Sequence, residues 1–176
     1  MKIFTQISAF LSLLAILFLG QGCEKARTEY PIEPKIAYKS HSLLYFNGNY
    51  TLKLLLDYTD GDGDLGLSET DSLPPFQDSG KYYFNFYAHY FEKINGEFTQ
   101  LTPNYPFPFG DTIHYHGRIP ELLDRNKKKP IKGEIQYDVA MGAGPLRGKE
   151  VKLRIYLYDR ALHKSNEIET PEITFP

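Results

Sequence analysis

The feature that most constrains the fold is an alternation of apolar and polar residues that recurs along the chain with a period of two. It is clearest in 50–57, 135–141 and 151–158. Because successive side chains of a strand point to opposite faces, each stretch predicts a strand with one buried face. In 82–91 both alternating rows are rich in aromatic rings, which predicts a central strand. The residues that we place on the inner faces are Leu54, Phe84, Phe86, Ile135, Leu153 and Ile155.

Turn residues separate the predicted strands. Asn47-Gly48 and Asn95-Gly96 each stand between two apolar stretches, and Asn-Gly tolerates the positive φ angles of a tight hairpin. The only helical feature that we expect is a turn at 120–124. Parallel strands would need crossover helices, so the sequence predicts an all-β protein, an antiparallel β-sandwich of about eight strands. Further strands are expected at 36–41, 43–46, 98–101, 112–118 and 167–175.

The first 22 residues have the layout of a signal peptide. Lys2 supplies a positive charge, the following stretch to Gly20 is largely apolar, and small residues stand at Gly20 and Gly22. The uninterrupted apolar part, Leu13–Gly20, is shorter than the ~20 residues that a membrane-spanning helix needs. A cleaved signal peptide is therefore favoured over a permanent transmembrane segment.

The only cysteine of the chain, Cys23, follows this segment directly. Exported proteins meet an oxidising compartment in which cysteines normally pair, and Cys23 has no partner in the sequence. The preceding Leu19-Gly20-Gln21-Gly22 resembles a bacterial lipobox, although Gly20 stands where that pattern usually has Leu. The resemblance implies that Cys23 is lipidated and becomes the first mature residue, with several acyl chains forming a stable anchor. The alternative is an ordinary secretory signal followed by an incidental thiol.

Composition and charge divide the rest of the chain and exclude two classes. The polar stretch 23–34 contains Pro31 and Pro34 and is predicted to be a short tether, followed by one β-sandwich domain over 35–176. With 41% hydrophobic residues, 14 Tyr and 12 Phe, the chain is not a disordered polar one, and its aromatic content favours strands. Its 20 Lys and Arg against 22 Asp and Glu leave a net charge of −2, without the basic surface expected of a nucleic-acid-binding protein.

The C-terminal part resembles the last hairpin of bacterial immunoglobulin-like domains. The relevant residues are the strand 151–159, the polar turn Arg160–Asn166 and the strand that starts at Glu167. With the lipobox-like segment, the prolines of the tether and the Asp-Gly-Asp-Gly-Asp segment, the whole chain is similar to small lipoproteins of the Bacteroidota that carry such a domain. This resemblance implies an immunoglobulin-like sandwich anchored in the cell envelope, at the outer membrane on its periplasmic or surface face. It implies no activity.

An acidic segment is the one constellation with metal-binding chemistry. Asp60, Asp62 and Asp64 alternate with glycines, and carboxylates at every second position of a turning backbone converge on one point. Calcium takes six to eight oxygen ligands of this kind. We expect calcium as the cofactor, with these three aspartates as ligands and Glu69 as a bidentate fourth.

The match to an EF-hand loop is incomplete in both possible registers. With Asp60 first, Leu65 stands where glycine is needed and Asp71 replaces the terminal Glu; with Tyr58 first, the first ligand is missing. Seven carboxylates and no Lys or Arg lie in 57–78, and a divalent ion would relieve their repulsion. The alternative is that the Asp-Gly repeats only form turns and that their acids face water.

Other chemical motifs are weaker. His114 and His116 would share one face of a strand, and His89 is the obvious third ligand for a zinc or copper site, but surface histidines without metal are commoner. The segment Gly142-Ala143-Gly144 leads into another strand, so it is expected to be a hairpin loop rather than a phosphate-binding turn. No Gly-x-Ser-x-Gly nucleophile motif is present.

Two classes of function follow. The first is a membrane-anchored, non-catalytic binding or assembly module with a calcium-stabilised loop, whose partner is an envelope protein or a glycan. Its aromatic segment 104–109 would supply a contact surface or cap the core. The second is a metal-dependent hydrolase that uses the acidic loop together with the histidines.

Overall fold

The computed structural model describes residues 29–102, 113–124, 126–142 and 146–176. The predicted signal peptide, Cys23, the first part of the tether, the aromatic segment 104–109 and most of the 142–144 loop lie outside these residues. Eight strands make up the described fold, and none of the described residues is helical. In chain order they are β1 (Lys35–Phe46), β2 (Asn49–Asp60), β3 (Phe86–Ile94), β4 (Glu97–Gln100), β5 (Ile131–Gly142), β6 (Glu150–Leu157), β7 (Ile168–Glu169) and β8 (Ile173–Thr174).

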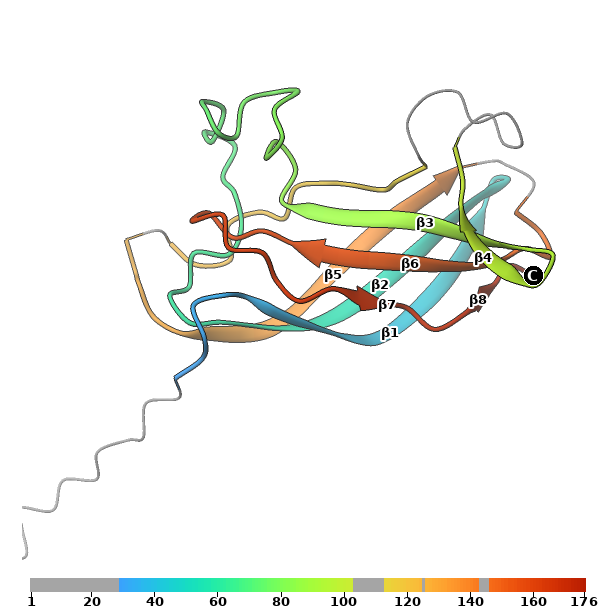
Figure 1. Ribbon diagram of the computed structural model, residues 1–176, viewed down its shortest axis with the longest axis horizontal. Coiled ribbons are helices and arrows are strands. Elements are labelled where there is room, and N and C mark those ends of the chain that lie inside the picture. The colour runs from blue at the N-terminus through green and yellow to red at the C-terminus, as the bar shows by residue number, and fades with distance from the viewer. Residues whose placement is uncertain (1–28, 103–112, 125, 143–145) are drawn as a thin grey trace, which may run out of the picture.

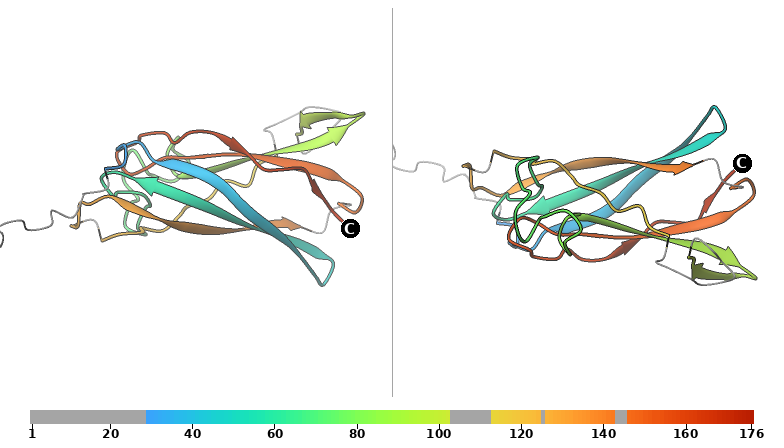
Figure 2. Two further views of the ribbon diagram at one scale, coloured as in Figure 1. Left: turned by 90° about the horizontal axis from the view of Figure 1, so that it is seen from below. Right: turned by 90° about the horizontal axis from the view of Figure 1, so that it is seen from above.

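The strands form two antiparallel sheets, as predicted. One sheet has the order β1-β2-β5, and the other has the order β4-β3-β6-β7, with β8 also paired to β6. Figure 1 shows the strands, and Figure 2 shows the sheets as two layers whose hairpins, β1–β2 and β3–β4, splay apart at the end away from the tether. The prediction of an all-β antiparallel sandwich is confirmed, whereas the immunoglobulin-like subtype stays a prediction.

The core is built by the alternation seen in the sequence. On β2, Leu52, Leu54 and Leu56 are fully buried, and the alternate residues of β3 and β6 face them from the other sheet. A side chain of this size contributes about 1.5–3 kcal/mol when it is removed from water. Of the predicted inner-face residues, all are buried except Phe84, which is only half-buried.

Both Asn-Gly hairpins are confirmed. Asn47 and Gly48 have φ angles of 49° and 81°, and Asn95 and Gly96 have 51° and 89°. Asn47-Gly48 closes the β1–β2 hairpin and Asn95-Gly96 the β3–β4 hairpin. The stretches 36–41 and 43–46, expected as separate strands, form the single strand β1 with a register shift between Tyr38 and Ser40.

The central strand begins later than expected. The alternation predicted a strand from residue 82, but β3 starts at Phe86. The reason is Asn85, which is buried and holds the backbone of Ile119: its Oδ1 accepts from the Ile119 N–H at 2.6 Å and its Nδ2 donates to the Ile119 carbonyl at 3.1 Å. This cross-link takes residue 85 out of the strand register and leaves Phe84 half-buried.

Two other predicted strands are broken up. The described part of 112–118 pairs with β3 through isolated bridges, His114 to His89 and Gly117 to Phe86, and not as a continuous strand. The predicted strand 167–175 is divided into β7 and β8, and Pro171 between them has no N–H to donate to a ladder. The turn at 120–124 contains no helix in its described residues.

Candidate metal site

Two buried aspartates extend the inner faces of the two sheets beyond their apolar rows. The even-numbered inner residues of β2 run through Leu56 to Asp60, its last residue. The odd-numbered inner residues of β6 run through Leu157 to Asp159, just past its end. Asp60 is 0% exposed and Asp159 is 1% exposed. The same alternation that builds the core therefore carries one carboxylate from each sheet into the interior at one end of the sandwich.

Four carboxylates meet at this end. Asp60, Asp62, Asp64 and Asp159 each offer an oxygen, and these four atoms all lie within 4.8 Å of one another. The first three were predicted from the sequence as ligands, whereas Asp159, which lies almost 100 residues later in the chain, was not. Glu69, the expected fourth ligand, is exposed and is not a member of this group.

Three buried carboxylate oxygens of the loop have no hydrogen-bond partner. Asp60 Oδ2 accepts from the Leu65 N–H at 2.9 Å, and Asp64 Oδ2 accepts from the Ala161 N–H at 3.0 Å. The Oδ1 atoms of Asp60, Asp62 and Asp64 are buried and have no partner. A buried, unpaired carboxylate oxygen costs several kcal/mol unless a cation or a proton reaches it.

The pKa values of two of these carboxyl groups reflect the cost of burying their charge. Burial, followed by the neighbouring carboxylate of Asp62, raises the pKa of Asp60 to about 6. Burial and the charges of Asp159 and Asp62 raise the pKa of Asp64 to about 6. Among the described residues, no lysine or arginine forms an ion pair with any of the four. The group therefore carries negative charge that no lysine or arginine in the described part of the chain neutralises.

His163 is the one described side chain with a positive form that pairs with the group. Its Nδ1 lies 2.8 Å from Asp159 Oδ2, and its backbone N–H donates to Asp159 Oδ1 at 2.8 Å. Burial still raises the pKa of Asp159 despite these bonds. The hydrogen bonds and charge of Asp159 in turn raise the pKa of His163.

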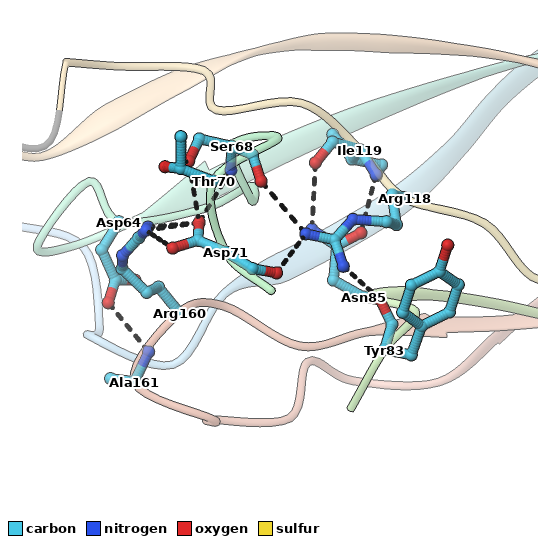
Figure 3. A network of polar contacts seen from close by, with 10 residues as sticks. All are labelled: Asp64, Ser68, Thr70, Asp71, Tyr83, Asn85, Arg118, Ile119, Arg160 and Ala161. Atoms are coloured by element: carbon cyan, nitrogen blue, oxygen red, sulfur yellow. Dashed lines mark hydrogen bonds and ion pairs between the residues drawn. The ribbon is translucent and has the colours of Figure 1, made fainter. Parts of the chain in front are cut away.

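A polar network fixes the acidic loop against the turn that follows β6 (Figure 3). Arg160 forms an ion pair with Asp71, with Nη1 donating to Oδ2 at 2.8 Å. Although burial opposes it, the Arg160 hydrogen bonds hold the pKa of Asp71 below its usual value. Arg118 donates to the carbonyls of Ser68, Asp71 and Tyr83 at 3.1, 3.0 and 2.9 Å. Asp71 is thus used in an ion pair rather than as the terminal ligand of an EF-hand loop.

The glycines of the loop are required by packing as well as by turning. Gly63 has φ of +75°, and a Cβ there would lie 2.2 Å from the Lys129 carbonyl oxygen. Gly66 has φ of +108°, and a Cβ there would lie 2.2 Å from the Pro120 carbonyl oxygen. The loop is therefore a packed element and not a solvated Asp-Gly turn. Within the loop, the N–H of the buried Leu65 donates back to Asp60 Oδ2 at 2.9 Å.

The predicted histidine site lies elsewhere. His114 and His116 stack with ring centroids 4.0 Å apart, and His89 meets His116 edge-on at 4.7 Å. The Nδ1 of His116 accepts from the Ala88 N–H at 3.1 Å. Among the described residues, the four aspartates are the only group of metal-ligating side chains, and these histidines are not part of it.

Comparisons with known protein families, with curated proteins and with solved structures found no match to this chain. Within the described residues, no helix has the length and apolarity needed to cross a membrane.

Proposed function

We propose that this protein is a non-catalytic lipoprotein of the cell envelope, anchored through Cys23 at the outer membrane, and that its sandwich is a binding or assembly module with a calcium-stabilised acidic loop. The observation that carries the calcium part is the fully buried Asp60, whose Oδ1 has no partner and belongs to a group of converging carboxylates. The anchor rests on the lipobox-like segment before the single cysteine.

Calcium suits the loop better than a smaller or softer ion. The ligands are all hard carboxylate oxygens, and no cysteine or histidine is a member of the group. Magnesium demands near-ideal octahedral geometry and keeps much of its water, whereas calcium accepts irregular sets of six to eight oxygens. Four carboxylates supply part of such a set, and backbone carbonyls and water supply the remainder in calcium loops.

A binding role is supported by apolar surface at the opposite end of the sandwich. Leu44, Tyr45 and Phe46 at the β1–β2 turn are 48%, 64% and 75% exposed. Contiguous exposed apolar side chains are typical of contact sites. A protein or a glycan of the envelope is the proposed partner, and the net charge of −2 argues against nucleic acid.

A metal-dependent hydrolase is the second candidate. It would need a general acid or base beside the ion. The histidines first considered for that role lie beside β3, and His163 is already hydrogen-bonded to Asp159. The non-catalytic module is therefore the proposal that the geometry supports better. Hydrolysis that required the loop aspartates would reverse this ranking.

Calcium binding is tested by thermal unfolding of the full chain purified in detergent. Because calcium binds the folded state alone, millimolar calcium raises the melting temperature by mass action and a chelator lowers it. Asp62→Asn weakens this response. Asp138→Asn, which removes the same charge from the outer face of β5, retains it. A wild-type melting curve that is identical in calcium and in chelator would contradict the calcium part of the proposal.

The anchor has its own test. Cys23→Ala moves the protein from the membrane fraction to the soluble fraction or leaves it unprocessed, because no other cysteine can carry the lipid. If the variant is processed and still fractionates with membranes, the lipoprotein proposal is wrong.

A further inference from the structure

Asp159 enters the carboxylate group from the other sheet. Asp60 is the last residue of β2 in the three-stranded sheet, and Asp62 and Asp64 follow it, whereas Asp159 follows β6 of the second sheet. The backbone on both sides of Asp159 is held in place: the Tyr158 N–H donates to the Asn85 carbonyl at 2.9 Å, and the Arg160 N–H donates to the Asp64 carbonyl at 3.3 Å. Its carboxylate therefore has a fixed position relative to β6.

Asp159 can bind an ion without giving up its present hydrogen bonds. Each carboxylate oxygen has two lone pairs, and His163 uses one lone pair on each oxygen of Asp159. The remaining lone pairs are available on a side chain whose orientation is already set. A histidine that orients a ligating carboxylate in this way lowers the cost of forming the site.

The spread of the four oxygens fits one central ion. Calcium–oxygen bonds measure 2.3–2.6 Å, so two ligands on opposite sides of the ion lie about 5 Å apart. The oxygens of Asp60, Asp62, Asp64 and Asp159 all lie within 4.8 Å of one another. Besides this spacing, the Oδ1 of Asp60 indicates a ligand, because it is fully buried and has no partner.

We propose that the cation is a clamp between the two sheets, with Asp159 as a ligand alongside the loop aspartates. The inference rests on the proposed calcium binding and adds what the ion does. A chain with one cysteine cannot close a disulfide within itself, and the ion supplies a cross-link between segments about 100 residues apart. It acts beside the contacts that already join these segments, the Arg160–Asp71 pair and the Ala161 N–H to Asp64 bond (Figure 3).

The clamp predicts that calcium protects both sides of the site. Hydrogen exchange of the full chain in detergent, measured with calcium and with chelator, slows in 60–66 and also in 159–166. This measurement needs no variant. Protection confined to 60–66 overturns the clamp while leaving calcium binding intact, and an absence of calcium binding to the wild type overturns both proposals.

Substitutions of individual aspartates test which of these side chains bind the ion. Calorimetric titration with calcium gives a dissociation constant for Asp159→Asn that is at least about tenfold weaker than for the wild type, because a charged ligand is lost. The amide oxygen of that variant still accepts from the His163 N–H, so the turn is retained. Asp62→Asn weakens binding comparably, and Asp138→Asn is the matched control that leaves it unchanged. Wild-type affinity in Asp159→Asn would overturn the clamp.

If Asp159→Asn does not fold, Asp159→Glu keeps the charge and displaces the carboxylate by one methylene. The clamp then predicts weaker calcium affinity and smaller protection of 159–166. Unchanged affinity and protection in this variant would also overturn it.

Discussion

The two ends of the sandwich depart from the usual distribution of side chains in opposite ways. At the end where the chain arrives from the tether, which we call the acidic end (60–66 and 159–163), carboxylates are buried. At the other end, which we call the hairpin end (44–49), large apolar side chains are exposed. Figure 1 shows the β1–β2 hairpin reaching away from the end at which β1 begins.

Because of this difference, the two ends are suited to different functions. Burying charge is tolerated only where something neutralises it, so the acidic end is suited to an ion and is braced by Arg160, Arg118 and tightly packed glycines. An exposed apolar turn adds little to folding, so the hairpin end is free to serve contact with another molecule. The middle of the sandwich, by contrast, follows the ordinary rule that apolar side chains are inside.

The largest expected effect contrasts leucines on the two sides of the same hairpin. Leu56 is fully buried on β2, four residues before Asp60 at the acidic end. Leu56→Ala therefore lowers the unfolding free energy by about 2–5 kcal/mol. Leu44→Ala at the hairpin end costs less than about 0.5 kcal/mol, because that side chain is half exposed. Denaturant unfolding of both variants measures the two values. Equal losses would mean that the two ends do not differ in packing as described.

Glycines provide the next contrast. Gly66 and Gly48 both have positive φ, but a Cβ at Gly66 would collide with the Pro120 backbone, whereas a Cβ at Gly48 meets nothing within 4 Å. Gly66→Ala is expected to cost about 3 kcal/mol or more, from the backbone conformation and the displaced neighbour together. Gly48→Ala is expected to cost about 1 kcal/mol, from the conformation alone. Similar losses in denaturant unfolding would contradict the close packing of the acidic loop.

The pH dependence of the metal-free protein tests the buried charge. The pKa of Asp60 in the folded protein is raised to about 6 from 3.8, so the folded state binds the proton more tightly than the unfolded state does. This contribution to stability is present below the unfolded pKa and is lost as pH rises through about 6. In chelator, acidification from about pH 7.5 to about pH 5 therefore stabilises the fold, by about 1 kcal/mol from Asp60.

Asp60→Asn is the control for this prediction, because it removes the titrating group and reduces the gain. Calcium has the opposite effect: it favours the ionised carboxylates, so the protein with calcium loses stability on acidification. Chemical denaturation at several pH values gives both curves. A metal-free wild type that loses stability steadily from about pH 7.5 to about pH 5 would contradict the uncompensated charge at the acidic end.

The sequence predicted the sandwich and its inner faces because the alternation is local. The same alternation, followed one step beyond β6, places Asp159 on the inner face, but nothing in the sequence connects the end of the predicted strand 151–159 with the Asp-Gly segment. Glu69 was chosen by its spacing in an EF-hand loop. Leu67 instead forms a β-bridge with Pro120 and donates to the Ile119 carbonyl at 3.0 Å, and the chain then turns at 69–70 with Glu69 in solvent.

Hydrogen bonds between residues far apart in the chain could not be predicted from the sequence, for a different reason. Arg160 binds Asp71 across 89 positions, and Asn85 binds Ile119 across 34, and neither pair has a local pattern. These pairs decide which backbone segments meet and therefore where the strands end. Predicting them requires the packing of the two sheets, which a one-dimensional alternation does not contain.

The smallest expected effect is at the hairpin end. Phe46 is 75% exposed, so Phe46→Ser removes little packing and is expected to change the unfolding free energy by less than about 0.5 kcal/mol. Tyr45, whose ring lies 4.7 Å from that of Tyr50, is the matched residue that still touches the fold, and Tyr45→Ser costs more. If the hairpin end is the contact surface of the module, Phe46→Ser also lowers recovery of envelope components in a pull-down, whereas Leu55→Ser on the outer face of β2 does not. A large loss of stability in Phe46→Ser would instead mean that this end packs like the middle of the sandwich, and its apolar side chains would no longer support a binding role.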